Sequence, residues 1–364
     1  MNRLKMHWEK VRSILIGAVM IGLLLFIWYS VGLYRQKKAV EAQIEERYRQ
    51  EETELGEEVQ EEIPETMRFL SDTVTYDGKT YRRNSYVKAI LCMGVDRKGG
   101  MQETTLSGDA GQADGVFLLA QDTARNQLKI LMIPRDSITE ITVTDVSQTE
   151  SNGTVLGKEL DHLSLAYSYG EGRETSCQYM TEAVSGLLGG LKIDSYMAAD
   201  TDVITTLNDA VGGVTVKIPT PGMEARDPAF VFGQQVHLQG AQAEMFVRYR
   251  DITKDNSALF RMSQQQEYIT GFFQAVKEKS KEDSRIVEKL FELTEENMVT
   301  DMGKEQYMKI AMDALADGSL TSGDFRMAPG MGTATDTYDE FYVDQEALTP
   351  VLLELFYRQT DGMQ

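Results

Sequence analysis

Cysteine and histidine are scarce in this chain. Its 364 residues include two cysteines, Cys92 and Cys177, and three histidines. Two cysteines cannot build a disulfide-stapled scaffold or a cysteine-rich zinc module, and three scattered histidines argue against a multi-histidine metal centre. Free buried thiols are the expected state of both cysteines, although a disulfide between them stays open outside the cytoplasm.

An excess of basic residues is also missing. The chain has 37 Lys+Arg against 57 Asp+Glu, which gives a formal net charge of -20. A protein that binds duplex DNA or RNA needs a basic face, so we exclude nucleic acid as a partner. The short motifs of P-loop nucleotide binding, of serine hydrolases and of zinc proteases are absent as well.

One long uncharged run lies near the N-terminus. Residues 13–34 contain no charged side chain, and about 20 helical residues span a bilayer. A core helix rarely reaches this length uncharged, and a cleaved signal peptide has a shorter apolar region. We predict a single-span membrane anchor with residues 1–12 in the cytoplasm. Basic residues outnumber acidic ones in this short segment, and such segments stay on the cytoplasmic side of a membrane. The rest of the chain is then extracellular.

Composition changes after the anchor. Residues 35–75 are rich in glutamate and other helix-forming residues, which predicts an acidic, partly helical stalk. A globular domain is expected over residues 76–358. Its apolar spacing alternates between strand and helix patterns, which favours a three-layer α/β architecture. The predicted strands cover residues 87–96, 115–122, 127–136, 213–219 and 243–251, and the predicted helices cover 175–191, 200–213 and 259–279.

Charged residues mark the ends of the first three predicted strands. A polar turn at 122–126 is typical of a hairpin, so the three strands are expected to form a meander. The meander brings Asp96, Asp114 and Arg135 to one sheet edge. Paired carboxylates suit Mg²⁺, and the planar guanidinium of arginine suits phosphate. Each acid alone is also a common strand-end or turn residue, as is Asp136.

More arginines follow later in the chain. Arg248 and Arg250 share a face if their segment is extended, and Arg261 and Gln265 share a face of the next helix. Arginines grouped in an acidic domain need a counter-charge. Either an anionic ligand supplies it, or nearby carboxylates such as Asp251 and Asp255 do.

These motifs, taken in order, resemble the LytR-CpsA-Psr family. The resemblance covers roughly residues 76–358 and extends into the C-terminal segment. The matching stretches are ILCMGVD (90–96), QADGVFLLAQD (112–122), LKILMIPRDS (128–137), LAYSYGEG (165–172), LGGLKIDSYM (188–197), LNDAVGGVTVKIP (207–219), LQGAQAEMFVRYRD (238–251) and RMSQQQEYI (261–269).

The resemblance implies an α/β/α fold with a mixed sheet and a deep apolar pocket for a polyprenyl chain. Family members come mostly from Gram-positive bacteria and are anchored on the outside of the cell. They transfer a glycopolymer from a polyprenyl-pyrophosphate carrier to peptidoglycan with the help of Mg²⁺, and some hydrolyse the pyrophosphate instead. An apolar tunnel near Met245, Phe246, Phe272 and Phe273 is expected here.

The family's site residues carry over one by one. Asp96 and Asp114 match its metal-side acids, and together with Arg135 they are the expected catalytic residues. The expected pyrophosphate-binding residues are Arg135, Arg248, Arg250, Arg261 and Gln265.

Three departures from the family pattern stand out. Gln112 replaces the arginine of an R-S-D motif, Gln264 replaces the second arginine of R-x-x-R-Q, and the segment from His162 to Tyr167 differs from K-I-N-H-A-Y. Losing two positive charges predicts weaker pyrophosphate binding in a divergent branch. Transferase, pyrophosphate hydrolase and non-catalytic binding protein therefore stay open, whereas the acidic charge and the missing helix-turn-helix signal argue against a transcription regulator.

Overall fold

The computed structural model describes residues 38–39, 42–43, 46–47 and 65–360, with gaps at 148–151, 252, 255–256, 317–319 and 336–337. The chain divides into two compact units, residues 1–62 and 63–364, and the fold below is that of the second. The predicted anchor at 13–34 falls outside the described residues, as does most of the predicted stalk. Within the described part of the chain, no helix is both long and apolar enough to cross a membrane.

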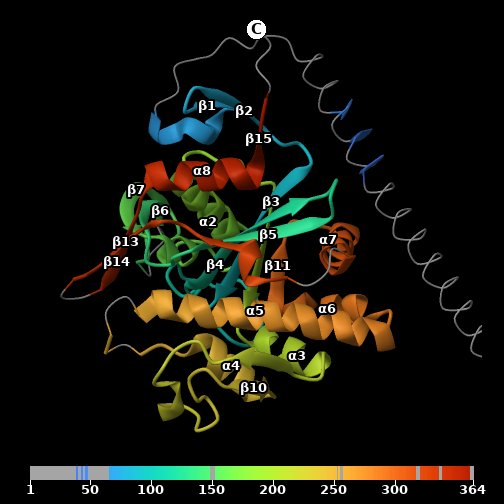
Figure 1. The fold of residues 1–364 in the computed structure, drawn as a ribbon. Helices are drawn as coiled ribbons and strands as arrows, with labels where there is room; N and C mark the ends of the chain where they lie inside the picture. The colour runs from blue at the N-terminus through green and yellow to red at the C-terminus, as the bar shows by residue number, and fades with distance from the viewer. Residues whose placement is uncertain are drawn as a thin grey trace, which may run out of the picture. The chain divides into compact units, whose positions relative to one another are not determined.

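A six-stranded mixed sheet forms the centre of the second unit (Figure 1). Its strand order is β11-β8-β3-β4-β5-β12. β4 runs antiparallel to β3 and β5, whereas β8 is parallel to β3 and β12 is parallel to β5. The strands are β3 Val87–Val95, β4 Ala113–Asp122, β5 Gln127–Ile133, β8 Ser195–Asp200, β11 Met298–Thr300 and β12 Phe325–Met327.

The predicted meander of the first three strands is confirmed. The turn between β4 and β5 forms because the Asp122 carboxylate accepts hydrogen bonds from the amides of Ala124 and Arg125, both at 2.9 Å. Asn126 then adopts a positive φ of 54°, a conformation that asparagine tolerates well. This turn fixes the register of β4 against β5 and so brings the end of β5 beside the start of β4. The antiparallel pairing of β3 with β4 brings the end of β3 to the same place.

Helices cover both faces of the sheet, which confirms the three-layer α/β/α prediction. Alternate residues of β3 point to opposite faces. Leu91 and Met93 join the core packed under α2 and α8, whereas Ile90 and Cys92 face the side of α5 and α7. The helices are α2 Glu174–Leu187, α3 Asp202–Ala210, α4 Ala241–Arg248, α5 Ser257–Glu282, α6 Ile286–Thr294, α7 Lys304–Ala316 and α8 Gln345–Phe356.

Smaller sheets surround this centre, and one of them moves the start of the domain. Phe69 of the 3₁₀ helix η1 (Glu65–Leu70) and Val74 of β1 are buried in the main core. Residues 65–75 therefore belong to the domain and not to the stalk where the sequence placed them. The small sheets pair β1 Thr73–Tyr76, β2 Lys79–Arg83 and β15 Tyr357–Gln359; β6 Ile138–Thr144 and β7 Val155–His162; β9 Val214–Lys217 and β10 Gln235–Leu238; and β13 Gly330–Ala334 and β14 Asp339–Val343.

The strand predicted over 243–251 is wrong. Residues 241–248 form the helix α4, and the backbone becomes extended only at Tyr249. The segment begins with alanine, glutamine and glutamate, which are strong helix formers. Glu244 and Arg248 form an ion pair at 3.0 Å across one helical turn, which adds to the helical preference.

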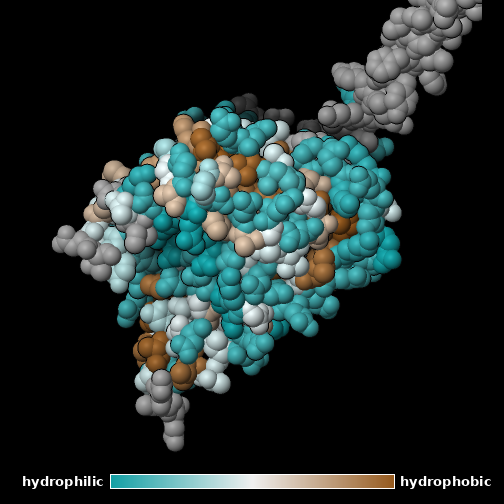
Figure 2. Space-filling model, turned by 90° about the horizontal axis from the view of Figure 1, so that it is seen from below, coloured by the Kyte–Doolittle hydropathy of each residue, from teal (hydrophilic) through white to brown (hydrophobic). Residues whose placement is uncertain are grey.

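Both cysteines are free and buried, as expected. Cys92 faces the α5 side of the sheet and Cys177 lies in the core on the other side, so the sheet separates them. The face seen from the side of α3 and α4 is hydrophilic over most of its area, with apolar residues gathered in a few patches (Figure 2).

Candidate active site

A β-bulge positions Asp114, one of the two acids predicted at the sheet edge. Gly94 of β3 pairs with Gly115 of β4, but Val95 pairs with Ala113, so Asp114 is an extra residue in β4. Bulges re-aim side chains at sheet edges. Asp96 follows β3 directly and donates its backbone N–H to Gln112 O at 2.9 Å. The two acids thus flank one irregular point of the sheet.

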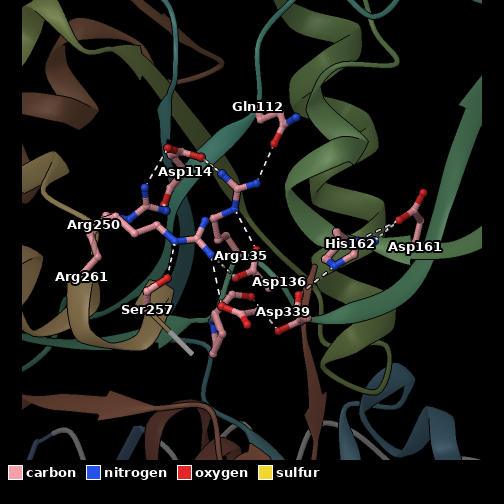
Figure 3. Close-up of polar contacts among 12 residues, drawn as sticks. Gln112, Asp114, Arg135, Asp136, Asp161, His162, Arg250, Ser257, Arg261 and Asp339 are labelled. Carbon is pink, nitrogen blue, oxygen red and sulfur yellow. Dashed lines mark hydrogen bonds and ion pairs between the residues drawn. The ribbon is translucent and has the colours of Figure 1, made fainter. Parts of the chain in front are cut away.

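Two arginines bind the Asp114 carboxylate, one on each oxygen (Figure 3). Arg135 Nη1 donates to Oδ1, and Arg261 Nη1 donates to Oδ2 at 2.9 Å. Arg261 Nη2 also donates to the backbone oxygen of Asp114 at 3.2 Å. Arg135 comes from the end of β5 and Arg261 from the first turns of α5. The predicted convergence of Asp114 and Arg135 is therefore present, and Arg261 joins it.

Arg135 is held by two further groups. Its Nε donates to Asp136 Oδ1 at 3.0 Å and its Nη2 donates to Gln112 Oε1 at 2.6 Å. Burial lowers the pKa of Arg135, while Asp136 opposes this shift. Gln112 occupies the position where the family often has arginine. Here its side chain accepts a hydrogen bond from Arg135 and adds no charge of its own.

Arg248 and Arg250 diverge instead of sharing a strand face. Arg248 ends α4 and pairs with Asp96 as well as with Glu244. Arg250 lies beyond the helix, where its Nη2 donates to Asp339 Oδ2 at 3.2 Å. Their separation follows from the helix that the sequence prediction missed, because Arg248 is the last residue of α4 whereas Arg250 follows the extended residue Tyr249.

The acidic partners of Arg250 also differ from the nearby carboxylates that were expected. Arg250 Nε donates to Ser257 Oγ at 2.7 Å, and Asp136 lies 3.9 Å from its Nη2. Asp251 instead accepts hydrogen bonds from Thr253 and pairs with Lys254. Asp255 lies outside the described residues. Sequence reasoning missed Asp339, because nothing in the sequence links the β14 hairpin to the arginines.

Arg261 is the most deeply placed arginine of the group. Its exposed fraction is 5%, and burial together with the nearby Arg250 lowers its pKa to about 10. The guanidinium still carries its charge at neutral pH. A buried cation beside other arginines is poised to gain from an anionic ligand that supplies more negative charge than Asp114 does.

The two glutamines that follow on α5 have different roles. Gln264 is buried, and its amide nitrogen, in the orientation that satisfies its surroundings, donates to Phe246 O at 3.1 Å and Tyr249 O at 2.9 Å. It therefore fixes the end of α4 and lies away from Asp114. Gln265 packs against Gly115 at the start of β4, where a glycine leaves room for the amide.

A polar pocket opens beside the arginines. Its volume is about 620 Å³, within the roughly 300–1,000 Å³ usual for ligand sites. Arg135, Asp136 and Arg250 line it. His162 and Tyr338 line it as well, with Ser164 in the 3₁₀ helix η2 (Leu163–Tyr167). His162, at the first position of the divergent motif, bonds Asp161 Oδ1 and Asp339 O, each at 3.0 Å.

An apolar cavity of about 350 Å³ lies between the sheet and the helices of the α5 side. Ile90, Cys92 and Phe117 of the sheet line it, and so do Phe272 and Phe273 of α5. This confirms two of the four residues predicted near an apolar tunnel. The other two do not line it: Phe246 and Met245 pack in the core that also contacts Phe272, and the Phe246 and Phe230 ring centroids lie 5.8 Å apart.

The donor chemistry at the sheet edge fits Mg²⁺ in part. Within the described ranges, no three Asp, Glu, His or Cys residues cluster as a metal site. Mg²⁺ commonly uses only one or two carboxylates and completes its shell with water and phosphate oxygens. Asp96 suits this, since its side chain is 45% exposed. Asp114 suits it less, since both of its oxygens already bind arginine.

Known proteins share the sequence pattern of this chain. Residues 37–355 match the LytR_cpsA_psr family. TagU of Bacillus cereus, a polyisoprenyl-teichoic acid–peptidoglycan teichoic acid transferase, is 27% identical over 44% of this chain and 44% of that protein. TagV of Bacillus subtilis, described in the same words, is 25% identical over 64% of this chain and 55% of that protein. The chain thus spans about half the length of these curated relatives.

Solved structures share the fold. The crystal structure of Bacillus subtilis TagV gives a TM-score of 0.53 at 20% identity, covering 74% of this chain and 97% of that chain. A protein from Streptococcus agalactiae gives 0.54 at 21% identity, covering 74% and 87%. Because the family match extends over most of the chain and the fold agrees, this protein belongs to the LytR-CpsA-Psr family.

Proposed function

We propose that this protein transfers a glycopolymer from a polyprenyl-pyrophosphate carrier to peptidoglycan. One observation carries the proposal: four arginines gather at a sheet edge, with α5 leading from Arg261 to the apolar cavity and with Arg135 and Arg250 lining the polar pocket. This order matches the order of groups in such a substrate, which has a hydrocarbon chain, a diphosphate and a saccharide. The transferase descriptions of TagU and TagV support the same reaction.

The helix α5 carries both Arg261 and part of the wall of the apolar cavity. Arg261 lies near its start and Phe273 lies twelve residues later. At 1.5 Å per residue this separation is about 18 Å along one rigid helix. A diphosphate at Arg261 therefore directs the first isoprene units along α5 toward the cavity wall that Phe272 and Phe273 form.

The arginines then stabilise the negative charge of the reacting phosphates. Arg135, Arg248, Arg250 and Arg261 bind the diphosphate and stabilise the charge that develops on its oxygens as polyprenyl phosphate leaves. Asp114 holds two of these arginines in place through both of its oxygens. We thus assign Asp114 to positioning Arg135 and Arg261 in the free enzyme.

Mg²⁺ is part of the proposal. Asp96 is the residue best placed to hold the ion, with Asp114 as the second acid. When bound, the ion would neutralise diphosphate charge and polarise its oxygens. Asp96 also pairs with Arg248, so this one carboxylate links the metal side of the site to α4.

We also propose that the N-terminal segment anchors the protein in the cell membrane as a single span, with the domain outside. This placement gives the domain access to both a membrane-held carrier and peptidoglycan. Residues 13–34 carry the proposal through their uncharged length.

A product assay tests the function. The full-length chain in detergent is incubated with a polyprenyl-pyrophosphate-linked saccharide, peptidoglycan fragments and Mg²⁺, and products are analysed by mass spectrometry. We expect a phosphodiester-linked conjugate that EDTA abolishes and that Arg135→Ala reduces about 10²–10³-fold. Arg285→Ala, which removes an exposed arginine of a distant ion pair, is the matched control. Free saccharide phosphate would instead indicate a hydrolase, and binding without any product would indicate a non-catalytic member.

A further inference from the structure

Two buried polar atoms at the polar pocket have no hydrogen-bond partner within the described residues, although Arg250 Nη2 lies 3.9 Å from one of them, Asp136 Oδ2. Asp136 is 7% exposed, and its Oδ1 accepts from Arg135, but its Oδ2 has no hydrogen bond to any described residue. Ser164 is fully buried, and its Oγ is likewise unpartnered within the described ranges. Both residues line the pocket. Leaving such groups unsatisfied costs stability, so each needs an explanation.

An exposed aromatic ring also lines the pocket. Tyr338 precedes β14 and is 67% exposed. Its ring meets His162 edge-on, with centroids 5.8 Å apart and planes at 69°. Since Asp161 and the Asp339 carbonyl hold both ring nitrogens of His162, this ring is a fixed support. The tyrosine face is left available for a flat partner.

The pocket is separate from the lipid side of the site. The residues that line it are different from those that line the apolar cavity. An aromatic face, a carboxylate oxygen and a hydroxyl are the groups that bind a sugar, which offers one apolar ring face and several hydroxyl donors. Because Arg135 and Arg250 also line the pocket, a diphosphate held by these arginines would lie beside it.

We propose that the polar pocket is the subsite for the acceptor saccharide, with Tyr338 stacked on a pyranose ring and with Asp136 and Ser164 bound to its hydroxyls. The assignment rests on the proposed function and extends it to the second substrate. Asp136 orients the attacking hydroxyl and accepts its proton, which makes it the catalytic base among the acids of the site.

The step balances as follows. The hydroxyl oxygen forms a new bond to the saccharide-linked phosphorus, and the bond from that phosphorus to the bridging oxygen breaks. The bridging oxygen leaves with the electron pair as part of polyprenyl phosphate. The hydroxyl proton passes to Asp136 and from there to solvent. No oxidant, reductant or further reactant is required.

Arg250 couples the two substrates. Its Nη2 forms an ion pair at 3.9 Å with Asp136 Oδ2, the oxygen assigned to the acceptor hydroxyl. A diphosphate that attracts this guanidinium frees the carboxylate. The donor should then bind first, and the affinity for acceptor should rise once the donor is in place.

Binding measurements on the full-length chain in detergent test the subsite. Farnesyl pyrophosphate serves as a donor without sugar, and a soluble disaccharide-peptide fragment of peptidoglycan serves as acceptor. Tyr338→Ala and Ser164→Ala should each raise the acceptor Kd about 2- to 13-fold and leave the Kd of farnesyl pyrophosphate unchanged. Tyr342→Ala is the matched control, because Tyr342 is an exposed tyrosine of the same hairpin that does not line the pocket.

Stability and rate separate this role from a structural one. Ser164→Ala should leave the Tm equal or higher, because the hydroxyl makes no hydrogen bond within the described protein. Asp136→Asn keeps the oxygen that Arg135 binds and should lower kcat for transfer about 10²–10⁴-fold. Farnesyl pyrophosphate should raise the acceptor affinity of the unmodified chain.

Several results would overturn the assignment. Unchanged acceptor binding in both pocket variants would do so, as would variants that weaken only a saccharide-bearing donor, which would place the donor sugar in the pocket. If Tyr342→Ala weakened acceptor binding as much as Tyr338→Ala did, the effect would come from the hairpin in general and not from the pocket. Failure of farnesyl pyrophosphate to bind the unmodified chain would instead refute the proposed function, and the acceptor assignment would fall with it.

Discussion

Replacing Arg261 by glutamine separates a binding role from a structural one. The pKa of Arg261 is lowered from its usual value above 12 to about 10, chiefly because of burial and then because of Arg250. At about 1.4 kcal/mol per pH unit, this disfavours the charged side chain by about 3 kcal/mol in the free protein. Asp114 keeps Arg135 after the substitution, and glutamine can still donate to its other oxygen.

We therefore expect Arg261→Gln to leave the free energy of unfolding unchanged or to raise it by up to about 3 kcal/mol. The Kd for farnesyl pyrophosphate should rise about 10- to 150-fold, the range for loss of a hydrogen bond to a charged group. Urea denaturation and calorimetric titration measure the two quantities. A fall in unfolding free energy of about 3–5 kcal/mol would refute the reasoning, since it would show a structural ion pair broken on one side.

Four further predictions concern the surroundings of the site. Gly271→Ala should destabilise the fold by about 1–3 kcal/mol in urea denaturation, because a Cβ there would lie 2.5 Å from the backbone oxygen of Thr215; an unchanged midpoint would contradict this close approach. Ala311→Phe should fill the apolar cavity and weaken long polyprenyl substrates more than farnesyl ones in competition binding, and equal weakening would argue against a chain site. Burial raises the pKa of Cys92 to about 12, so at pH 8 it should react with a disulfide reagent about 10³-fold more slowly than a free thiol, and farnesyl pyrophosphate should slow it further if the cavity holds the chain. Asp96→Ala should raise the Mg²⁺ concentration needed for half-maximal transfer, and an unchanged magnesium titration would remove Asp96 from the metal role.

The sheet edge was predictable because local signals determine it. The Asp122 turn fixes the antiparallel pairing of β4 and β5, so the end of β5 meets the start of β4. This places Arg135 beside Asp114 from sequence alone. The bulge that frees Asp114 was not predicted, since it depends on how two glycines pair across strands.

Arg248 at the end of α4 and Arg250 just beyond it were predicted less well. An alternating pattern of two arginines reads as a strand, but the residues before it favour a helix that ends at Arg248. The partner of Arg250 could not be found at all, because Asp339 lies 89 positions away on a hairpin with no motif of its own. Contacts of this length depend on the tertiary fold, so only the family resemblance pointed toward that region.

The ion pairs at the sheet edge have a consequence for selectivity. In the free protein each of the four arginines already faces a carboxylate: Asp114 for Arg135 and Arg261, Asp96 for Arg248, and Asp339 for Arg250. A small anion such as inorganic phosphate must displace these carboxylates and has little else to gain. A lipid diphosphate also buries a hydrocarbon chain, at roughly 25 cal/mol for each Å² of apolar surface. If the proposed function holds, the acids therefore make the site favour a diphosphate that carries a lipid tail over inorganic phosphate.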